Sequence, residues 1–278
     1  NAFGNCSGAT SMIIEDIPQG SNTNFWYYGC ENLKTLRIED SKEILSIGSL
    51  PDAPFEEVYI GRNLTDTPFE NCKYSIETVT FGECVTSVPN SIFENSTNLN
   101  SVVFGNNINY IGWSAFANTS LKSVSVPTGV DTLYSNTFSN NGTLASITLP
   151  QTLKHIGHAC FSGSAITNVT FPNNIVNIDG FNDCESLETI VIPEGAESIE
   201  PYAFSGCKSL KSISIPDKVT KIGDHAFSLC KDIEHIAIGK GVKEIGDGAF
   251  YECYTPHDVY YNGSLSDWCR ITMDVRGY

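Results

Sequence analysis

Histidine and cysteine side chains are the residues of this chain best suited to chemistry, because they bind metals and act as bases or nucleophiles. The 278 residues include ten cysteines and five histidines. His155 and His158 stand three apart with Cys160 nearby, a spacing that metal ligands can use. No Cys-x-x-Cys pair occurs, so zinc and redox motifs lack their minimal spacing. We interpret these positions as ordinary turn and strand-edge residues, and we predict no metal and no cofactor.

Other catalytic signatures are weak. Gly239 and Gly241 superficially resemble a phosphate-binding loop, but they fall at turns with no crossover helix after them. No Gly-x-Ser-x-Gly follows a strand, and the acidic residues lack the alternating pattern of a calcium-binding loop. We therefore predict that the chain is not an enzyme.

Composition argues against several classes of partner. The chain has 16 basic and 32 acidic residues, a formal net charge of -16. Nucleic acids require clustered Lys and Arg, and an anionic membrane surface repels an acidic chain. No stretch approaches the roughly 18 apolar residues of a spanning helix. We expect no nucleic-acid partner and no membrane insertion, with any signal or anchor outside this sequence.

The elements that position these residues are copies of one unit. Ten segments share an apolar pattern at positions 1, 4 and 6, among them LETIVIP from 187, LKSISIP from 210 and IEHIAIG from 233. Weaker copies start at Ala9 and Pro256, which gives about twelve repeats of 21 to 24 residues. Such regular self-similarity is typical of a solenoid, in which stacked units bury a shared core.

Each unit predicts one strand and one short turn. Alternating apolar residues ended by Pro or Gly are typical of a half-buried strand. A second apolar pair follows, such as Val219 with Ile222, and then a glycine turn and an Ala-Phe pair such as Ala203-Phe204. We expect the Ala-Phe segment to form a single helical or 3-10 turn with its phenylalanine buried.

The cysteines follow the same period. Seven of them lie three residues after the aromatic position of the unit: Cys6, Cys30, Cys72, Cys184, Cys207, Cys230 and Cys253. We expect Asn95 or Asn118 to fill this column in other units. Buried cysteine packs as a small hydrophobe, and parallel side chains bring neighbouring sulfurs together poorly. We favour free thiols over the disulfides that an exported chain would otherwise suggest.

The string L-x-x-I-x-I-P…V-x-x-I-G-x-x-A-F-x-x-C-x-x-L, clearest over residues 210–256, resembles the BspA-like leucine-rich repeat of microbial surface proteins. The resemblance implies a right-handed leucine-rich-repeat solenoid with a parallel sheet on its concave face. It also implies a secreted or surface-anchored protein that takes part in adhesion or protein contacts. We assign residues 1–255 to the array, with an irregular N-terminal third, and residues 256–278 to a last strand and C-terminal cap.

Strand positions 3 and 5 are expected to line the exposed sheet. They form a flat face of hydroxyls and β-branched groups, which also suits plain strand packing. Exposed aromatics are the second class of candidate, because aromatic side chains are frequent at interaction hot spots. The candidate partner-binding residues are Tyr59, Thr80, Trp113, Ser123, Ser125, Ser146, Thr148, Asn168, Thr170 and Tyr260.

The function that follows is binding. We predict a monomeric extracellular or cell-surface module whose sheet contacts a surface or matrix protein of a host or neighbouring cell. Two alternatives stay open, a glycan-binding accessory module and a structural spacer that projects another domain. Clustered exposed aromatics would favour the glycan, and a featureless sheet would favour the spacer.

Overall fold

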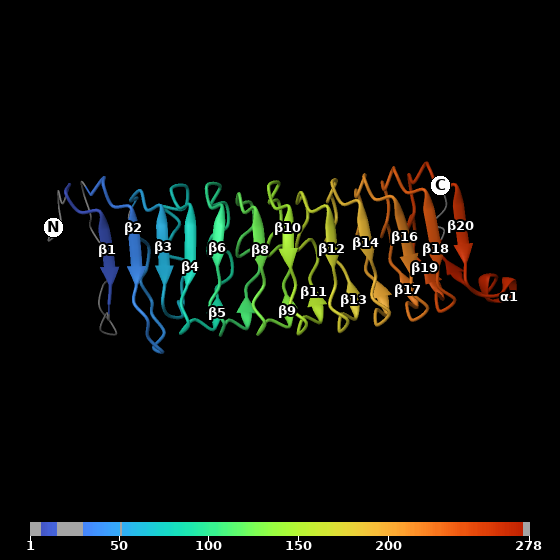
Figure 1. Cartoon of the computed structure of the whole chain (residues 1–278), viewed down its shortest axis with the longest axis horizontal. Coiled ribbons are helices and arrows are strands. Elements are labelled where there is room, and N and C mark those ends of the chain that lie inside the picture. Colours follow the sequence, from blue (N-terminus) through green and yellow to red (C-terminus); the bar gives the residue numbers. More distant parts are fainter. Residues whose placement is uncertain (1–6, 16–29, 51, 275–278) are drawn as a thin grey trace.

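The computed structural model describes residues 7–15, 30–50 and 52–274. These residues form a single stack of coils, placed side by side in a nearly straight row (Figure 1). Each coil carries one long strand, as the alternating pattern predicts. The described residues hold twelve of them: β1 (Ser11–Ile14), β2 (Thr35–Ile38), β3 (Glu57–Ile60), β4 (Thr78–Phe81), β6 (Ser101–Val103), β8 (Ser123–Ser125), β10 (Ser146–Thr148), β12 (Asn168–Thr170), β14 (Thr189–Val191), β16 (Ser212–Ile215), β18 (His235–Ile238) and β20 (Asp258–Tyr261).

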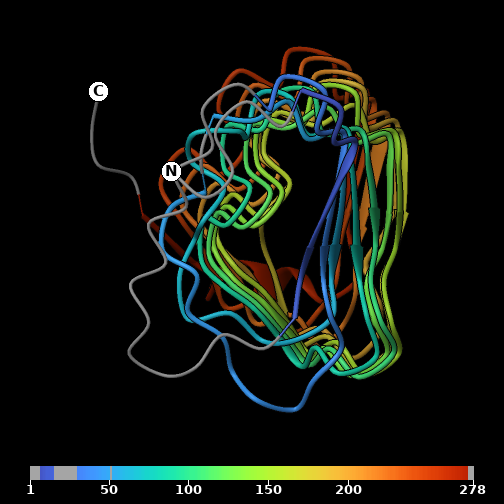
Figure 2. The ribbon, with the colours of Figure 1, turned by 90° about the vertical axis from the view of Figure 1, so that its left-hand side faces the viewer.

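The described long strands form four hydrogen-bonded groups, and within each group they pair in parallel and in register. The first group contains β1, β2, β3, β4 and β6 in that order. The others are β8 with β10, β12 with β14, and β16 with β18 and β20. Because every coil repeats the same pattern, equivalent residues face each other, as Ser212 faces His235. When the solenoid is viewed along its axis the coils nearly superimpose (Figure 2), so this sheet is a nearly straight wall without the deep hollow of a horseshoe.

A second, narrower sheet lies across the core from the first. Its strands are two residues long: β5 (Ser87–Val88), β7 (Tyr110–Ile111), β9 (Thr132–Leu133), β11 (His155–Ile156), β13 (Asn177–Ile178), β15 (Ser198–Ile199), β17 (Lys221–Ile222), β19 (Glu244–Ile245) and β21 (Thr272–Met273). The strands from β9 to β21 form one seven-stranded parallel sheet. From β5 on, the second residue of that apolar pair, such as Ile222, therefore lies in a strand, which the sequence pattern did not predict.

The Ala-Phe segment is a turn with two alternating sets of hydrogen bonds. Ala203 and Ser205 donate their backbone N–H groups to carbonyls three residues earlier, whereas Tyr202, Phe204 and Gly206 donate to the next coil. Tyr202 and Gly206 have positive φ angles of 61° and 76°, which breaks any continuous helical path. The segment predicted as a helical or 3-10 turn is thus a turn in which every second backbone N–H group donates a hydrogen bond to the next coil.

The core consists of stacked columns of identical side chains. Nine phenylalanines from successive coils stack with ring centroids 4.9 to 5.9 Å apart, running from Phe69 to Phe250. Each pair contributes about 0.5–1.5 kcal/mol beyond its area burial. Leucine, isoleucine and valine columns from both sheets complete the core. Between β20 and β21 lies α1 (Leu265–Trp268), a single helical turn capped by Ser264 and Asp267.

Candidate functional site

The outward side chains of seven neighbouring long strands, β4 to β16, form an uncharged band that we call the hydroxyl face. Its residues are Thr78, Thr80, Ser101, Val103, Ser123, Ser125, Ser146, Thr148, Asn168, Thr170, Thr189, Val191, Ser212 and Ser214. Charged residues directly precede several of the strands, such as Glu77, Lys122, Glu188 and Lys211, and border the band. The face is therefore neutral in its middle and charged along one edge.

The centre of the hydroxyl face has hydrogen-bonding groups to spare. Ser146 and Thr148 on β10 face Ser123 and Ser125 on β8, residue by residue. These four side chains are exposed, and their hydroxyls make no hydrogen bond within the described part of the chain. Thr170, on β12, is exposed in the same way. Five hydroxyls in adjacent rows are thus available to an external partner, both as donors and as acceptors.

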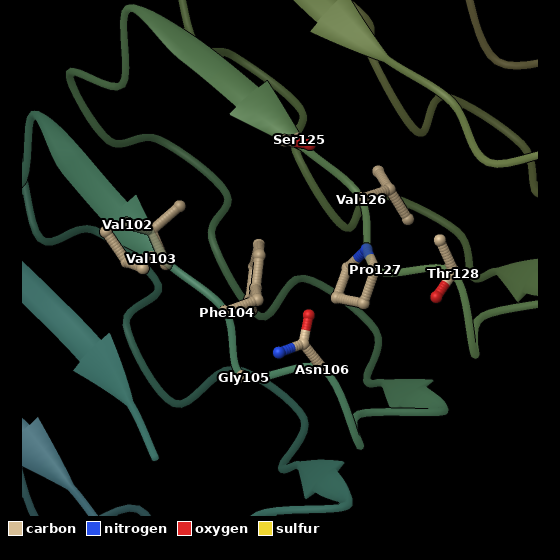
Figure 3. Close-up of a pocket in the computed structure, with 9 residues that line it drawn as sticks. All are labelled: Val102, Val103, Phe104, Gly105, Asn106, Ser125, Val126, Pro127 and Thr128. Atoms are coloured by element: carbon tan, nitrogen blue, oxygen red, sulfur yellow. The ribbon is translucent and has the colours of Figure 1, made fainter. Parts of the chain in front are cut away.

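A cleft interrupts the hydroxyl face where the ladder between β6 and β8 is broken (Figure 3). It has a volume of about 320 Å³ and lies between residues 102–106 on one wall and 125–128 on the other. The partly buried ring of Phe104 lines one wall, and Pro127 lines the other. Val103 at its rim is 56% exposed. The cleft offers an apolar depression beside the free hydroxyls of β8.

Two sequence changes coincide with this break. The residue after the strand changes from Gly105 to Pro127, and a proline has no N–H group to donate to a sheet. In the regular N-terminal coils that N–H donates across the sheet, as from Gly82 to the carbonyl of Ile60. The core side chain before it also shrinks from Phe104 to Val126, which leaves space beside the ring. The cleft was not predicted from the sequence, although the change from glycine to proline could have indicated it.

The structure does not bring all ten predicted residues together. Ser123, Ser125, Ser146, Thr148, Asn168 and Thr170 lie on three adjacent strands, β8, β10 and β12. Thr80 lies two strands away on β4, and Tyr260 on β20 is 58% exposed near the C-terminal end. Trp113 follows the short strand β7 and therefore lies outside the long-strand sheet.

Tyr59 lies on β3 in a charged cluster beside the hydroxyl face. The guanidinium of Arg37 stacks on the Tyr59 ring at 4.0 Å from its centroid. The Tyr59 hydroxyl contacts both carboxylate oxygens of Asp40 at 2.8 and 2.9 Å, and Arg37 also pairs with Glu39. Partial burial and the Asp40 carboxylate raise the pKa of Tyr59 above its ordinary value. Tyr59 is thus held by its own neighbours and is less available to a partner than its sequence position indicated.

The cysteine column is unbridged in the described residues, as the spacing predicts; Cys6 lies outside them. The thiols of Cys184, Cys207 and Cys230 each donate to the carbonyl of the core phenylalanine in the preceding coil, at 3.2 Å. Burial raises the pKa of Cys184 to about 11. These thiols are therefore protonated and buried at neutral pH, which suits packing and not nucleophilic chemistry.

The prediction that Asn95 or Asn118 fills the cysteine column is wrong. Coils without the cysteine place Ser96, Thr119, Asn141 and Ser164 there, three residues after their phenylalanines. Asn95 and Asn118 come one residue earlier and have φ angles of 63° and 56°. Asparagine tolerates this left-handed conformation better than most residues, which explains its frequency at that position.

The histidines singled out at the start lie apart from the hydroxyl face. His155 is on the short strand β11, and His158 follows two residues after that strand. His158 Nδ1 lies 3.7 Å from a carboxylate oxygen of Asp179, which accepts from the Gly180 N–H. Burial raises the pKa of Asp179. Among the described residues no group of three or more His, Cys, Asp or Glu side chains is placed to hold a metal ion.

Residues 62–180 and 176–269 match the BspA type leucine rich repeat region, in six copies. The chain belongs to this family. No curated protein sequence matches the chain. A leucine-rich repeat protein from Bacteroides ovatus has a similar structure, with a TM-score of 0.65, 21% sequence identity, and coverage of 94% of this chain and 70% of that one.

A leucine-rich cell surface protein from Faecalibacterium prausnitzii is also similar, at a TM-score of 0.47 and 23% identity, over 94% of this chain and 86% of that one. At 21% identity the similarity to the Bacteroides ovatus protein shows the fold alone. Within the described part of this BspA-type chain, no helix has the length and apolar character needed to cross a membrane.

Proposed function

We propose that this BspA-type solenoid is a non-catalytic binding module, displayed outside the cell, whose hydroxyl face contacts a protein partner. The observation that supports this most is the uncharged band over seven strands, in a chain with 32 acidic residues. Depletion of charge at the centre and charge at the rim is the composition of protein interfaces. An extracellular location is proposed from the family, whose known members include surface proteins.

The cleft between β6 and β8 allows this face to select partners that present a side chain of matching size. Its volume of about 320 Å³ accommodates one large apolar or aromatic side chain of a partner. Such an anchor, surrounded by hydrogen bonds to the free hydroxyls of Ser123 and Ser125, is the arrangement that interaction hot spots favour. A spacer has no need of an uncharged face with unpaired hydroxyls, so we place it second.

The test is a binding screen of the purified chain against immobilised extracellular-matrix proteins by surface plasmon resonance. The triple variant Ser123→Arg, Thr148→Arg and Thr170→Arg places three cations on adjacent strands of the hydroxyl face. A matched control, His155→Arg, Asn177→Arg and Ser198→Arg, adds three arginines to the short strands β11, β13 and β15. We expect at least a tenfold loss of affinity for the first variant and little change for the second. Equal binding by both variants would refute the hydroxyl face as the contact surface.

A further inference from the structure

Three aromatic side chains from two adjacent coils meet on the short-strand side of the solenoid; we call Tyr110, Trp113 and Tyr134 the aromatic ledge. The ring centroids of Tyr110 and Tyr134 are 5.1 Å apart, and those of Trp113 and Tyr134 are 6.5 Å apart. Tyr110 belongs to β7, and Tyr134 follows β9 directly. The ledge is therefore separate from the hydroxyl face, which lies on the long strands.

The fold does not require this cluster. Trp113 is 57% exposed, while Ile111, Ala115 and Phe116 around it in the sequence fill the core completely. In other coils the position of Trp113 holds polar or small residues, such as Ser135 and Asp224. An indole at this place leaves most of its apolar surface in water, so it gains little of the stabilisation that burial provides, and a ligand that covered it would supply that gain.

The ledge is held in a fixed arrangement from beneath. The side-chain oxygen of Asn90 accepts from the Tyr110 hydroxyl and from the Trp113 backbone N–H, both at 3.0 Å. Gly112 permits this close approach, because a Cβ there would lie 2.4 Å from the Asn90 side-chain oxygen. Partial burial and the neighbouring Tyr134 raise the pKa of Tyr110, in keeping with a packed ring. The rings are thus preorganised in the free protein, which reduces the entropic cost of binding a ligand.

Hydrogen-bonding groups surround the rings. The indole N–H of Trp113, the hydroxyl of Tyr134 and the amide nitrogen of Asn90 make no hydrogen bond within the described residues. The hydroxyls of Ser114 and Ser135, which directly follow Trp113 and Tyr134 in the sequence, likewise make no hydrogen bond in the same part of the chain. Donors and acceptors therefore border an aromatic surface, a combination that suits a ligand with one apolar face and a rim of hydroxyls.

The charged residues near the rings limit the class of ligand that the aromatic ledge can bind. Residues 86–90, 109–114 and 131–136, the short strands and turns of the coils that carry the rings and Asn90, contain no lysine or arginine. Lys154 follows in the next coil, where its backbone N–H donates to the Asp131 carbonyl. Asp131, directly before β9, contributes negative charge in the coil of Tyr134. A phosphate, a sulfated sugar or a uronic acid would find no lysine or arginine in those three segments and would meet the overall charge of -16.

We propose that the aromatic ledge is a binding subsite for a neutral pyranose ring of a polysaccharide. The C–H groups on one face of such a ring carry small positive charges and pack on the negative faces of aromatic rings. Its equatorial hydroxyls then reach Asn90, Ser114 and Ser135. This site binds a different ligand from the hydroxyl face, and the two proposals are tested independently.

The experiment is affinity gel electrophoresis of the intact chain in native gels that contain one polysaccharide each. Neutral probes are laminarin, mannan, xylan and hydroxyethyl cellulose, and anionic probes are polygalacturonate and heparin. We expect at least one neutral probe to retard the chain. Trp113→Ala and Tyr134→Ala should each weaken that retardation at least tenfold in apparent Kd. Tyr74→Ala, which removes an aromatic ring of nearly equal exposure (59%) elsewhere, should leave it unchanged.

Two controls make the result decisive. Circular dichroism and thermal unfolding establish that the variants fold, and Trp113→Phe, which keeps a ring, should retain part of the affinity. Retardation by none of the neutral probes, retardation by the anionic probes alone, or retardation that survives Trp113→Ala overturns the proposal. The hydroxyl-face triple variant should bind the polysaccharide normally, so a failure of one proposal is distinguishable from a failure of the other.

Discussion

Replacing Ser96 by cysteine should stabilise the protein, although the side chain is completely buried. Ser96 occupies the cysteine column, and its hydroxyl has no hydrogen-bond partner within the described residues. In equivalent positions Cys184 and Cys207 reach the carbonyl of the preceding coil at 3.2 Å. The shorter C–O bond of serine prevents this reach. An unsatisfied buried polar group costs about 1–3 kcal/mol, and the larger sulfur also fills space.

We therefore expect Ser96→Cys to raise the free energy of unfolding by about 1–2 kcal/mol, which corresponds to about 2–4 °C in Tm. Differential scanning calorimetry and urea unfolding under reducing conditions measure both quantities. Thr119→Cys at the same column is the control. The Thr119 hydroxyl contacts the Asn141 side-chain oxygen at 2.6 Å, so its loss should destabilise by about 1 kcal/mol. If both substitutions change stability in the same direction, the reasoning about this column is wrong.

Three further predictions concern the core. Phe161→Ala removes a fully buried ring that stacks on Phe138 at 5.7 Å and on Phe181 at 5.2 Å, and should cost about 3–5 kcal/mol in urea unfolding. Asn141→Ala leaves the carbonyls of Phe116 and Phe138 without their amide donor and should cost about 2–4 kcal/mol in the same assay, whereas exposed Asn109→Ala should cost far less. Burial raises the pKa of Cys184 from 9.0 to about 11, so its contribution to stability is complete below pH 9 and is lost as the pH rises to 11. Urea midpoints should fall over that range, and native protein should react with iodoacetamide at exposed Cys269 long before Cys184; equal rates would contradict the buried column.

The sequence was sufficient to predict the long strands and the core columns, because each depends on one repeated spacing. The apolar residues at positions 4 and 6 alternate over enough positions to identify a strand, and Ile213 and Ile215 are both buried as expected. The short strands escaped prediction because a strand of two residues, such as Lys221–Ile222, has no period to detect. Their pairing comes from stacking, which aligns each pair with its copies in the next coils.

The candidate sites were predictable only where they follow a column. Ser123, Ser146 and Asn168 occupy position 3 of their units, so alignment of the repeats places them side by side. The aromatic ledge was missed because Tyr110 and Tyr134 occupy different positions in their units and meet diagonally between coils. Trp113 was correctly singled out as an exposed aromatic, but its neighbours became evident only when the coils were stacked.

The distribution of hydrogen bonds explains how one solenoid can offer two independent surfaces. The backbone hydrogen bonds that join neighbouring coils lie in the paired strands and in the turns, so a side chain that points outward contributes little to stacking. Outward positions on β8 to β12 and at the aromatic ledge can therefore vary without loss of the fold, as nearest-neighbour stability in repeat proteins implies. Because the two surfaces belong to different sheets, a substitution such as Thr148→Arg should leave the rings at Trp113 in place. Binding measured on each surface thus reports on that surface alone.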